Sequence, residues 1–175
     1  MHTQTFVAAV AAFATLVPSV LAGNAIVRNN CPFPVYLQSV GNTGNVPEHT
    51  IQSGGVFQEQ YRENPNGGGI SLKISNKPSG AQITQFEYTL AGPKVFYDVS
   101  NINGYPFVDY GLSLASTTHA GCPAINCPPG VKLCHDAYNK PDDNHATKAC
   151  ASASDLTMTL CISGKSRRHQ RDFAN

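Results

Sequence analysis

Short runs in which hydrophobic and polar residues alternate follow one another along most of the chain. Residues 70–75 alternate Ile or Leu with Ser or Lys, and residues 156–162 alternate Leu, Met or Ile with Thr or Cys. A period of two is typical of a strand with one buried face. Turns rich in Gly, Pro and Asn separate the runs, and no convincing amphipathic helix pattern occurs after the N-terminal segment, so the pattern predicts an all-β sandwich. Strands are predicted over 25–28, 34–40, 56–61, 70–75, 83–90, 95–100, 109–115 and 156–162.

The centre of the chain predicts a β-hairpin. Segments 83–90 and 95–100 are rich in β-branched and aromatic residues, and they flank the turn-forming residues 91–94. A register symmetric about this connection gives one apolar or aromatic face and places Glu87 opposite Asp98, whereas a one-residue slip would mix the two faces. The apolar face then consists of the pairs Leu90 with Val95, Tyr88 with Tyr97, and Phe86 with Val99.

The opposed carboxyls are the main chemical candidate. Directly opposite side chains have Cβ atoms roughly 4.5–5.5 Å apart, and like charges at that spacing destabilise a sheet unless something offsets them. Glu87 and Asp98 therefore favour a bound cation, a shared proton or a ligand. The alternative is that both carboxylates point into water on a solvated face, and spacing alone does not separate these interpretations.

The two ends of the chain differ from its body. Residues 1–22 hold an apolar run too short to span a bilayer, followed by small residues, which predicts a secretory signal peptide with the mature chain starting near Gly23. Residues 165–175 carry a charge of +3 within a chain of net charge +1, so they form a basic tail that we expect to be disordered. Residues 23–164 are the expected domain, without a membrane span. The charge pattern does not favour nucleic-acid binding.

The chain contains six cysteines, an even number in a protein expected to be exported, so we expect all of them to be oxidised. Their spacing lacks the paired short intervals of common zinc modules, and we expect no metal or other cofactor. Most of them lie in residues 117–153, which are rich in Pro, Gly and Asn and are predicted to be a loop region. The cysteines are Cys31, Cys122, Cys127, Cys134, Cys150 and Cys161.

Several segments together resemble the thaumatin-like family, in the reduced form of small secreted fungal members (antigenic thaumatin-like, or Bys1-type, proteins). They span nearly all of the expected domain, and their order and spacing make the resemblance specific. The resemblance implies a thaumatin-like β-sandwich in which a short disulfide-stapled loop region replaces the large second domain of plant members. The matching segments are 26–31, 35–36, 87–90, 96–100, 104–105, 134–138 and the closing strand through Cys161.

The resemblance also implies disulfides and a site. The matched cysteines imply the pairs Cys31–Cys161, Cys122–Cys150 and Cys127–Cys134. Plant-type members have an acidic cleft of one arginine, one glutamate and three aspartates, associated with β-glucan binding and weak glucanase activity. The glutamate and the first aspartate match Glu87 and Asp98. The remaining positions match less well: the second aspartate falls on Asn103, the third on Asp142 or Asp143, and the arginine on Gly69, with Lys73 the nearest basic residue.

Three functions follow from these observations. The favoured one is a secreted, non-catalytic protein that binds or remodels fungal cell-wall polysaccharide (β-glucan) during spore germination or growth, with Tyr105 near the acidic site. The second is a surface antigen or virulence factor that binds a host surface protein. The third is a weak β-glucanase in which Glu87 and Asp98 serve as acid and as base or nucleophile, at a spacing that suits a retaining enzyme. The incomplete cleft argues against the enzyme. In each case the protein is secreted, and the first function also implies association with the cell wall.

Overall fold

The computed structural model describes residues 22–42, 46–118 and 121–163. The expected tail and all but the last residue of the expected signal peptide lie outside these ranges. Among the described residues, no helix is long and apolar enough to cross a membrane. The elements are β1 (Asn24–Asn29), β2 (Val35–Val40), β3 (His49–Ile51), β4 (Val56–Gln60), β5 (Ile70–Ser75), β6 (Thr84–Ala91), β7 (Lys94–Ser100), β8 (Leu112–Ser116), β9 (Ile125–Cys127), the short 3-10 helix η1 (Asn144–Ala146), β10 (Lys148–Ala151) and β11 (Leu156–Leu160).

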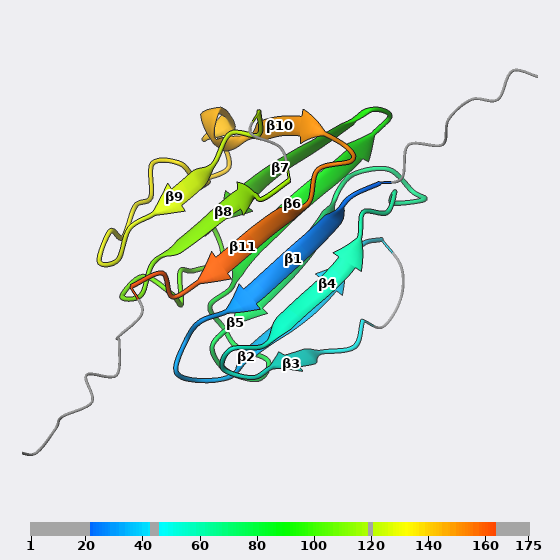
Figure 1. The fold of residues 1–175 in the computed structure, drawn as a ribbon. Helices are drawn as coiled ribbons and strands as arrows, with labels where there is room; N and C mark the ends of the chain where they lie inside the picture. The colour runs from blue at the N-terminus through cyan, green and yellow to red at the C-terminus, as the bar shows by residue number, and fades with distance from the viewer. Residues whose placement is uncertain (1–21, 43–45, 119–120, 164–175) are drawn as a thin grey trace, which may run out of the picture.

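The strands form two sheets packed face to face, which confirms the predicted all-β sandwich. One sheet has the order β4-β1-β11-β8-β9 and the other β10-β7-β6-β5-β2-β3. Figure 1 shows the five-stranded sheet in front of the six-stranded one. The pairing within the sheets is antiparallel, except that β1 and β11, from opposite ends of the domain, pair in parallel.

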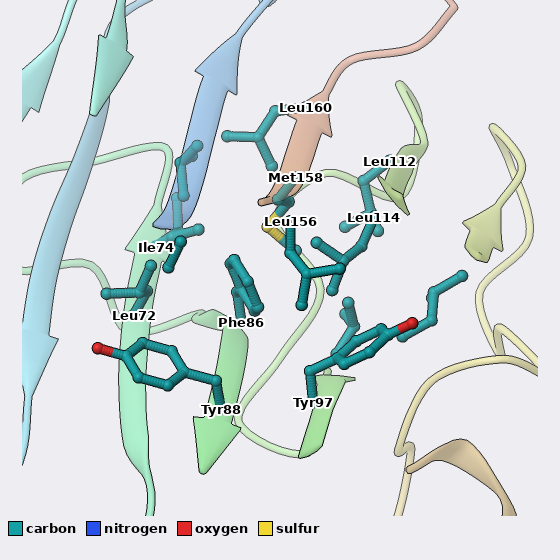
Figure 2. Close-up of a cluster of buried hydrophobic side chains, with 14 of the residues drawn as sticks. Leu72, Ile74, Phe86, Tyr88, Tyr97, Leu112, Leu114, Leu156, Met158 and Leu160 are labelled. Carbon is teal, nitrogen blue, oxygen red and sulfur yellow. The ribbon is translucent and has the colours of Figure 1, made fainter. Parts of the chain in front are cut away.

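The core lies between the two sheets and is built from the alternating apolar positions. Figure 2 shows Phe86, Tyr88 and Tyr97 of the six-stranded sheet pointing toward Leu114 and Leu156 of the other sheet. These five side chains are at most 1% exposed. Because successive side chains of a strand point to opposite faces, the residues between the buried ones lie on the outer face of the six-stranded sheet.

Three disulfides join the pairs that the resemblance implies, and among the described residues no cysteine is free. The Cys31–Cys161 bond links the end of the first strand to the end of the last, across 130 residues. The other two bonds, Cys122–Cys150 and Cys127–Cys134, hold the segment that precedes β11.

The structure corrects the strand prediction at three places. Residues 117–153, predicted to be loop, contain β9, η1 and β10, whose three or four residues are too few to show a period. The strand β3 in the first half of the chain was missed for the same reason. The strand predicted over 109–115 begins only at Leu112, because Gly111 has a φ of +68° and ends a turn in which its N–H bonds to the carbonyl of Phe107.

Candidate functional site

The β6–β7 hairpin has the predicted register. Tyr88 lies opposite Tyr97, and Glu87 lies opposite Asp98. The connection is tighter than the predicted four residues, because Ala91 and Lys94 already pair and only Gly92 and Pro93 form the turn. Gly92 adopts a φ of +57°, a left-handed conformation that glycine reaches without strain.

Burial raises the pKa of both opposed carboxyls, and the Glu87 charge adds to the rise at Asp98. Burial raises the pKa of Glu87, although hydrogen bonding with Ser71 and the charge of Lys73 lower it in part. The pKa of Asp98 rises to about 7, first through burial, then through the charge of Glu87 and hydrogen bonding with it. Asp98 Oδ1 is buried and has no hydrogen-bond partner among the described residues. The pair therefore holds a proton near neutral pH, and one carboxyl oxygen of Asp98 is buried without a partner among the described residues.

Both carboxyls line a hollow of about 340 Å³ on the outer face of the six-stranded sheet. We call this hollow the carboxyl groove. At its edge, the Phe96 side chain is 41% exposed, a high value for a large hydrophobic residue. Gly69 lets its segment pack closely against β6, because a Cβ there would approach Thr89 Oγ1 to 2.7 Å and the Tyr88 carbonyl oxygen to 2.8 Å. The groove is lined by Gly69, Ile70, Ser71, Glu87, Tyr88, Thr89, Phe96, Asp98 and Thr147.

Polar side chains continue from the groove along the outer face. Ser71 Oγ donates a hydrogen bond to Gln85 Oε1 at 3.0 Å, and Gln85 Nε2 donates to Asn103 Oδ1 at 3.1 Å. Asn103 therefore lies at the far end of this hydrogen-bonded row, and Gln85 separates it from Ser71, which lines the carboxyl groove. Lys73, the nearest basic residue in the sequence, pairs with Gln85 and is close enough to affect Glu87 electrostatically.

Asp142 and Asp143 lie elsewhere, in the loop that precedes η1. Asp143 Oδ2 accepts hydrogen bonds from the backbone N–H groups of Asn139 at 2.9 Å and Lys140 at 3.1 Å, which lower the pKa of this exposed carboxyl. Asp142 pairs with Lys140 at 3.3 Å. Asp143 lines a different hollow, beside His135 and His145. These contacts order the loop, and neither aspartate lines the carboxyl groove.

Tyr105 is half-buried and packs against the core. Burial raises its pKa to about 12, and its hydroxyl has no hydrogen-bond partner among the described residues. It does not line the carboxyl groove. In the described part of the chain, no three His, Cys, Asp or Glu side chains gather in a way that would hold a metal ion.

Phe96 and Thr147 are among the groove residues that the sequence analysis did not assign to the site. Phe96 is two residues from Asp98 on β7, so both side chains lie on the same outer face of the sheet. The predicted hairpin register was therefore sufficient to place Phe96 beside the carboxyls. Thr147 comes from the loop before β10, where no period exists, and no sequence signal places it next to Asp98. The groove is thus built from the predicted hairpin and from a loop that packs beside it.

Comparison with solved structures defines the class of protein. The structure superposes on the crystal structure of the protein elicitor MoHrip2 from Magnaporthe oryzae with a TM-score of 0.67 and 29% identity, covering 80% of this chain and 99% of that one. It also superposes on the thaumatin-like xylanase inhibitor TLXI with a TM-score of 0.52 and 13% identity, covering 78% and 98% of the two chains. The second likeness concerns the fold alone, and that fold is thaumatin-like.

The sequence comparisons narrow this class. The chain matches the family Bys1, described as Blastomyces yeast-phase-specific protein, over residues 12–162. It is 45% identical over 177 residues to an antigenic thaumatin-like protein of Arthroderma benhamiae, covering 99% of this chain and 90% of that protein. It is 38% identical over 146 residues to the secreted thaumatin-like protein calA of Emericella nidulans, covering 82% and 84%. The chain therefore belongs to the Bys1 family of small fungal thaumatin-like proteins. The secreted relative and the three disulfides are consistent with an extracellular protein.

Proposed function

We propose that this protein is secreted and acts without catalysis, binding fungal cell-wall polysaccharide of the β-glucan class through the carboxyl groove. The observation that carries the proposal is the composition of the groove, in which two opposed carboxyls lie beside the exposed ring of Phe96. Sugar hydroxyls both donate and accept hydrogen bonds, and the faces of a sugar ring are apolar. A site of this kind, with a few polar groups beside an aromatic surface, suits such a ligand.

The arrangement of the acidic residues supports binding over hydrolysis. Glycosidases place their carboxyls on either side of the scissile bond, about 5–5.5 Å apart in retaining enzymes and about 6.5–9.5 Å apart in inverting ones. Glu87 and Asp98 instead lie directly opposite each other on adjacent strands, close enough to affect each other's pKa. The other acidic positions that the resemblance implies are absent from the groove, because Asp142 and Asp143 lie outside it and Asn103 is an amide, so the groove is suited to binding.

The test is co-sedimentation of the purified protein with insoluble β-glucan and with isolated fungal walls. Glu87→Gln and Asp98→Asn should each reduce the bound fraction, because each removes an acceptor that faces the ligand. Asp109→Asn is the matched control, since Asp109 is an exposed carboxylate outside the groove. Binding by both groove variants equal to that of the wild type would exclude the groove as the site.

The same variants separate binding from hydrolysis. A non-catalytic protein releases no reducing sugar from soluble β-glucan, whichever variant is used. Release by the wild-type protein that disappears in Glu87→Gln, with sedimentation retained, would replace this proposal with the glucanase. The same wall preparations, taken from germinating spores and from growing cells, test a role in germination or growth.

A second candidate function is recognition of a host surface protein, as an antigen or virulence factor. A related protein is named antigenic, and MoHrip2 is described as a protein elicitor. In this chain the Cys127–Cys134 disulfide closes a loop that exposes Leu133 by 76% and Val131 by 40%. Such a constrained apolar loop is a suitable contact for another protein. If Leu133→Ser reduces binding to host cells while wall binding persists, this function gains support.

A further inference from the structure

We propose that the ligand site continues across the sheet to a second hollow, lined by Tyr36, Gln38, Glu48, Lys73 and Ser75, so that the protein binds an extended oligosaccharide chain and not a single sugar. This inference rests on the proposed function, because it takes the carboxyl groove as the first contact site. It adds a binding site formed by β2, β5 and the loop before β3.

The second hollow has a volume of about 40 Å³, enough for a hydroxyl or hydroxymethyl group but not for a whole ring. Its walls combine polar side chains with the apolar surface of Ile83 and the half-buried Tyr36 ring. Glu48 Oε2 accepts a hydrogen bond from the backbone N–H of Ser79 at 3.1 Å, which ties two loops together at its rim. The hollow is thus a shallow contact at which one substituent of a longer chain fits.

Both hollows lie on the same face of the same sheet. On β5, Ser71 lines the carboxyl groove, and Lys73 and Ser75 line the second hollow. Their spacing of two residues puts all three side chains on the outer face. Across the strands, Lys73 pairs with Gln38 on one side and with Gln85 on the other. The surface between the hollows is therefore continuous and polar.

The separation of the hollows sets the size of the ligand. Asp98 lies on β7 and Tyr36 on β2, and β6 and β5 lie between them. Three inter-strand steps of about 4.8 Å, combined with an offset of four residues along the strands at about 3.3 Å each, make a distance of roughly 20 Å, which exceeds one sugar ring. A chain that contacts Phe96 at one end and Tyr36 at the other must therefore cross the strands. Along this path the half-buried Lys73 ammonium and Gln38 amide offer donors to sugar oxygens.

The test measures the affinity of the full mature chain for β-1,3-glucan oligosaccharides from disaccharide to hexasaccharide by titration calorimetry. Wild-type affinity should rise with length until the chain reaches Tyr36. Tyr36→Thr keeps a residue of high β propensity in the strand and should weaken binding of the longest oligosaccharides roughly 3- to 10-fold, the size of one lost aromatic contact. The same variant should leave the disaccharide affinity unchanged. Lys73→Gln should act in the same direction.

Two further variants separate this inference from the proposed function. Phe96→Thr should weaken binding at every length, because it alters the carboxyl groove. Gln58→Thr, on the outer face of the other sheet, is the matched control and should bind as the wild type does. An affinity that does not depend on oligosaccharide length would exclude the second hollow. Wild-type binding by Tyr36→Thr and Lys73→Gln, together with impaired binding by Phe96→Thr, would also exclude the second hollow and would leave the carboxyl groove as the site. If no oligosaccharide binds, both proposals fail.

Discussion

Replacing Asp98 by Asn should change how the stability of the protein depends on pH. The Asp98 carboxyl has its pKa raised from 3.8 to about 7 in the fold, mainly by burial and then by Glu87. An acid whose pKa is raised in the folded state keeps its proton there at pH values at which the unfolded chain has lost it. The wild-type free energy of unfolding should therefore fall as the pH rises from about 4 to about 7.

The size of this effect follows from the shift. About three pH units, at about 1.4 kcal/mol per unit, give a loss of at most about 4 kcal/mol between the two ends of the range. Part of the loss arises from the Glu87 charge, so Glu87→Gln should reduce it without abolishing it. An Asn at position 98 cannot ionise, so this contribution is absent from Asp98→Asn at every pH.

Urea unfolding followed by circular dichroism, repeated between about pH 4 and about pH 8, measures the difference directly. The stability of Asp98→Asn relative to the wild type should increase across this range, by up to about 4 kcal/mol. Asp109→Asn provides the control for an exposed carboxylate. Parallel curves for wild type and Asp98→Asn would show that Asp98 ionises normally in the fold, and the account of the pair would be wrong.

Two further predictions concern the framework of the fold. Replacing both cysteines of the Cys31–Cys161 bond by Ala should lower the free energy of unfolding by about 5 kcal/mol, because this bond closes a loop of 130 residues. The same change at Cys127–Cys134, whose loop spans 7 residues, should lower it by only about 2 kcal/mol. Equal losses in denaturant titrations would contradict the loop-entropy reasoning. Gly69→Ala should cost about 1–3 kcal/mol and reduce wall binding, since its Cβ would approach Thr89 Oγ1 to 2.7 Å within the groove. If Gly69→Ala has the melting temperature and wall binding of the wild type, the backbone at this position shifts enough to accommodate the added Cβ, and the prediction is wrong.

The hairpin was predictable because its two faces differ so strongly. Only one register keeps Tyr88 opposite Tyr97 and leaves Glu87 opposite Asp98, and a slip by one residue would expose aromatic rings. The same alternation identifies the strands of the core. The opposed carboxyls of the groove could therefore be located from the sequence, although the degree of their burial could not.

The loop before β10 was not predictable, because long-range contacts hold it. The backbone N–H of Tyr138 donates to the carbonyl of Val99, and Asn139 Nδ2 donates to the carbonyl of Cys134. These bonds and the disulfides determine the path of the chain, and none of them leaves a periodic pattern. For this reason Asp142 and Asp143, which were expected at the site, instead order a loop outside the carboxyl groove. Thr147, which was not expected there, lines the carboxyl groove.

The central position of β11, paired in parallel with β1, makes completion of the five-stranded sheet depend on the last strand described. In the five-stranded sheet, β11 separates the β4–β1 pair from the β8–β9 pair. Until residues 156–160 have emerged and inserted, this sheet exists only as two fragments with unpaired edges, and the Cys31 thiol has no partner. Completion of the fold must wait for the last strand, and such long-range closure is slow. A nascent chain of this topology would therefore remain unable to close its core until β11 had been released.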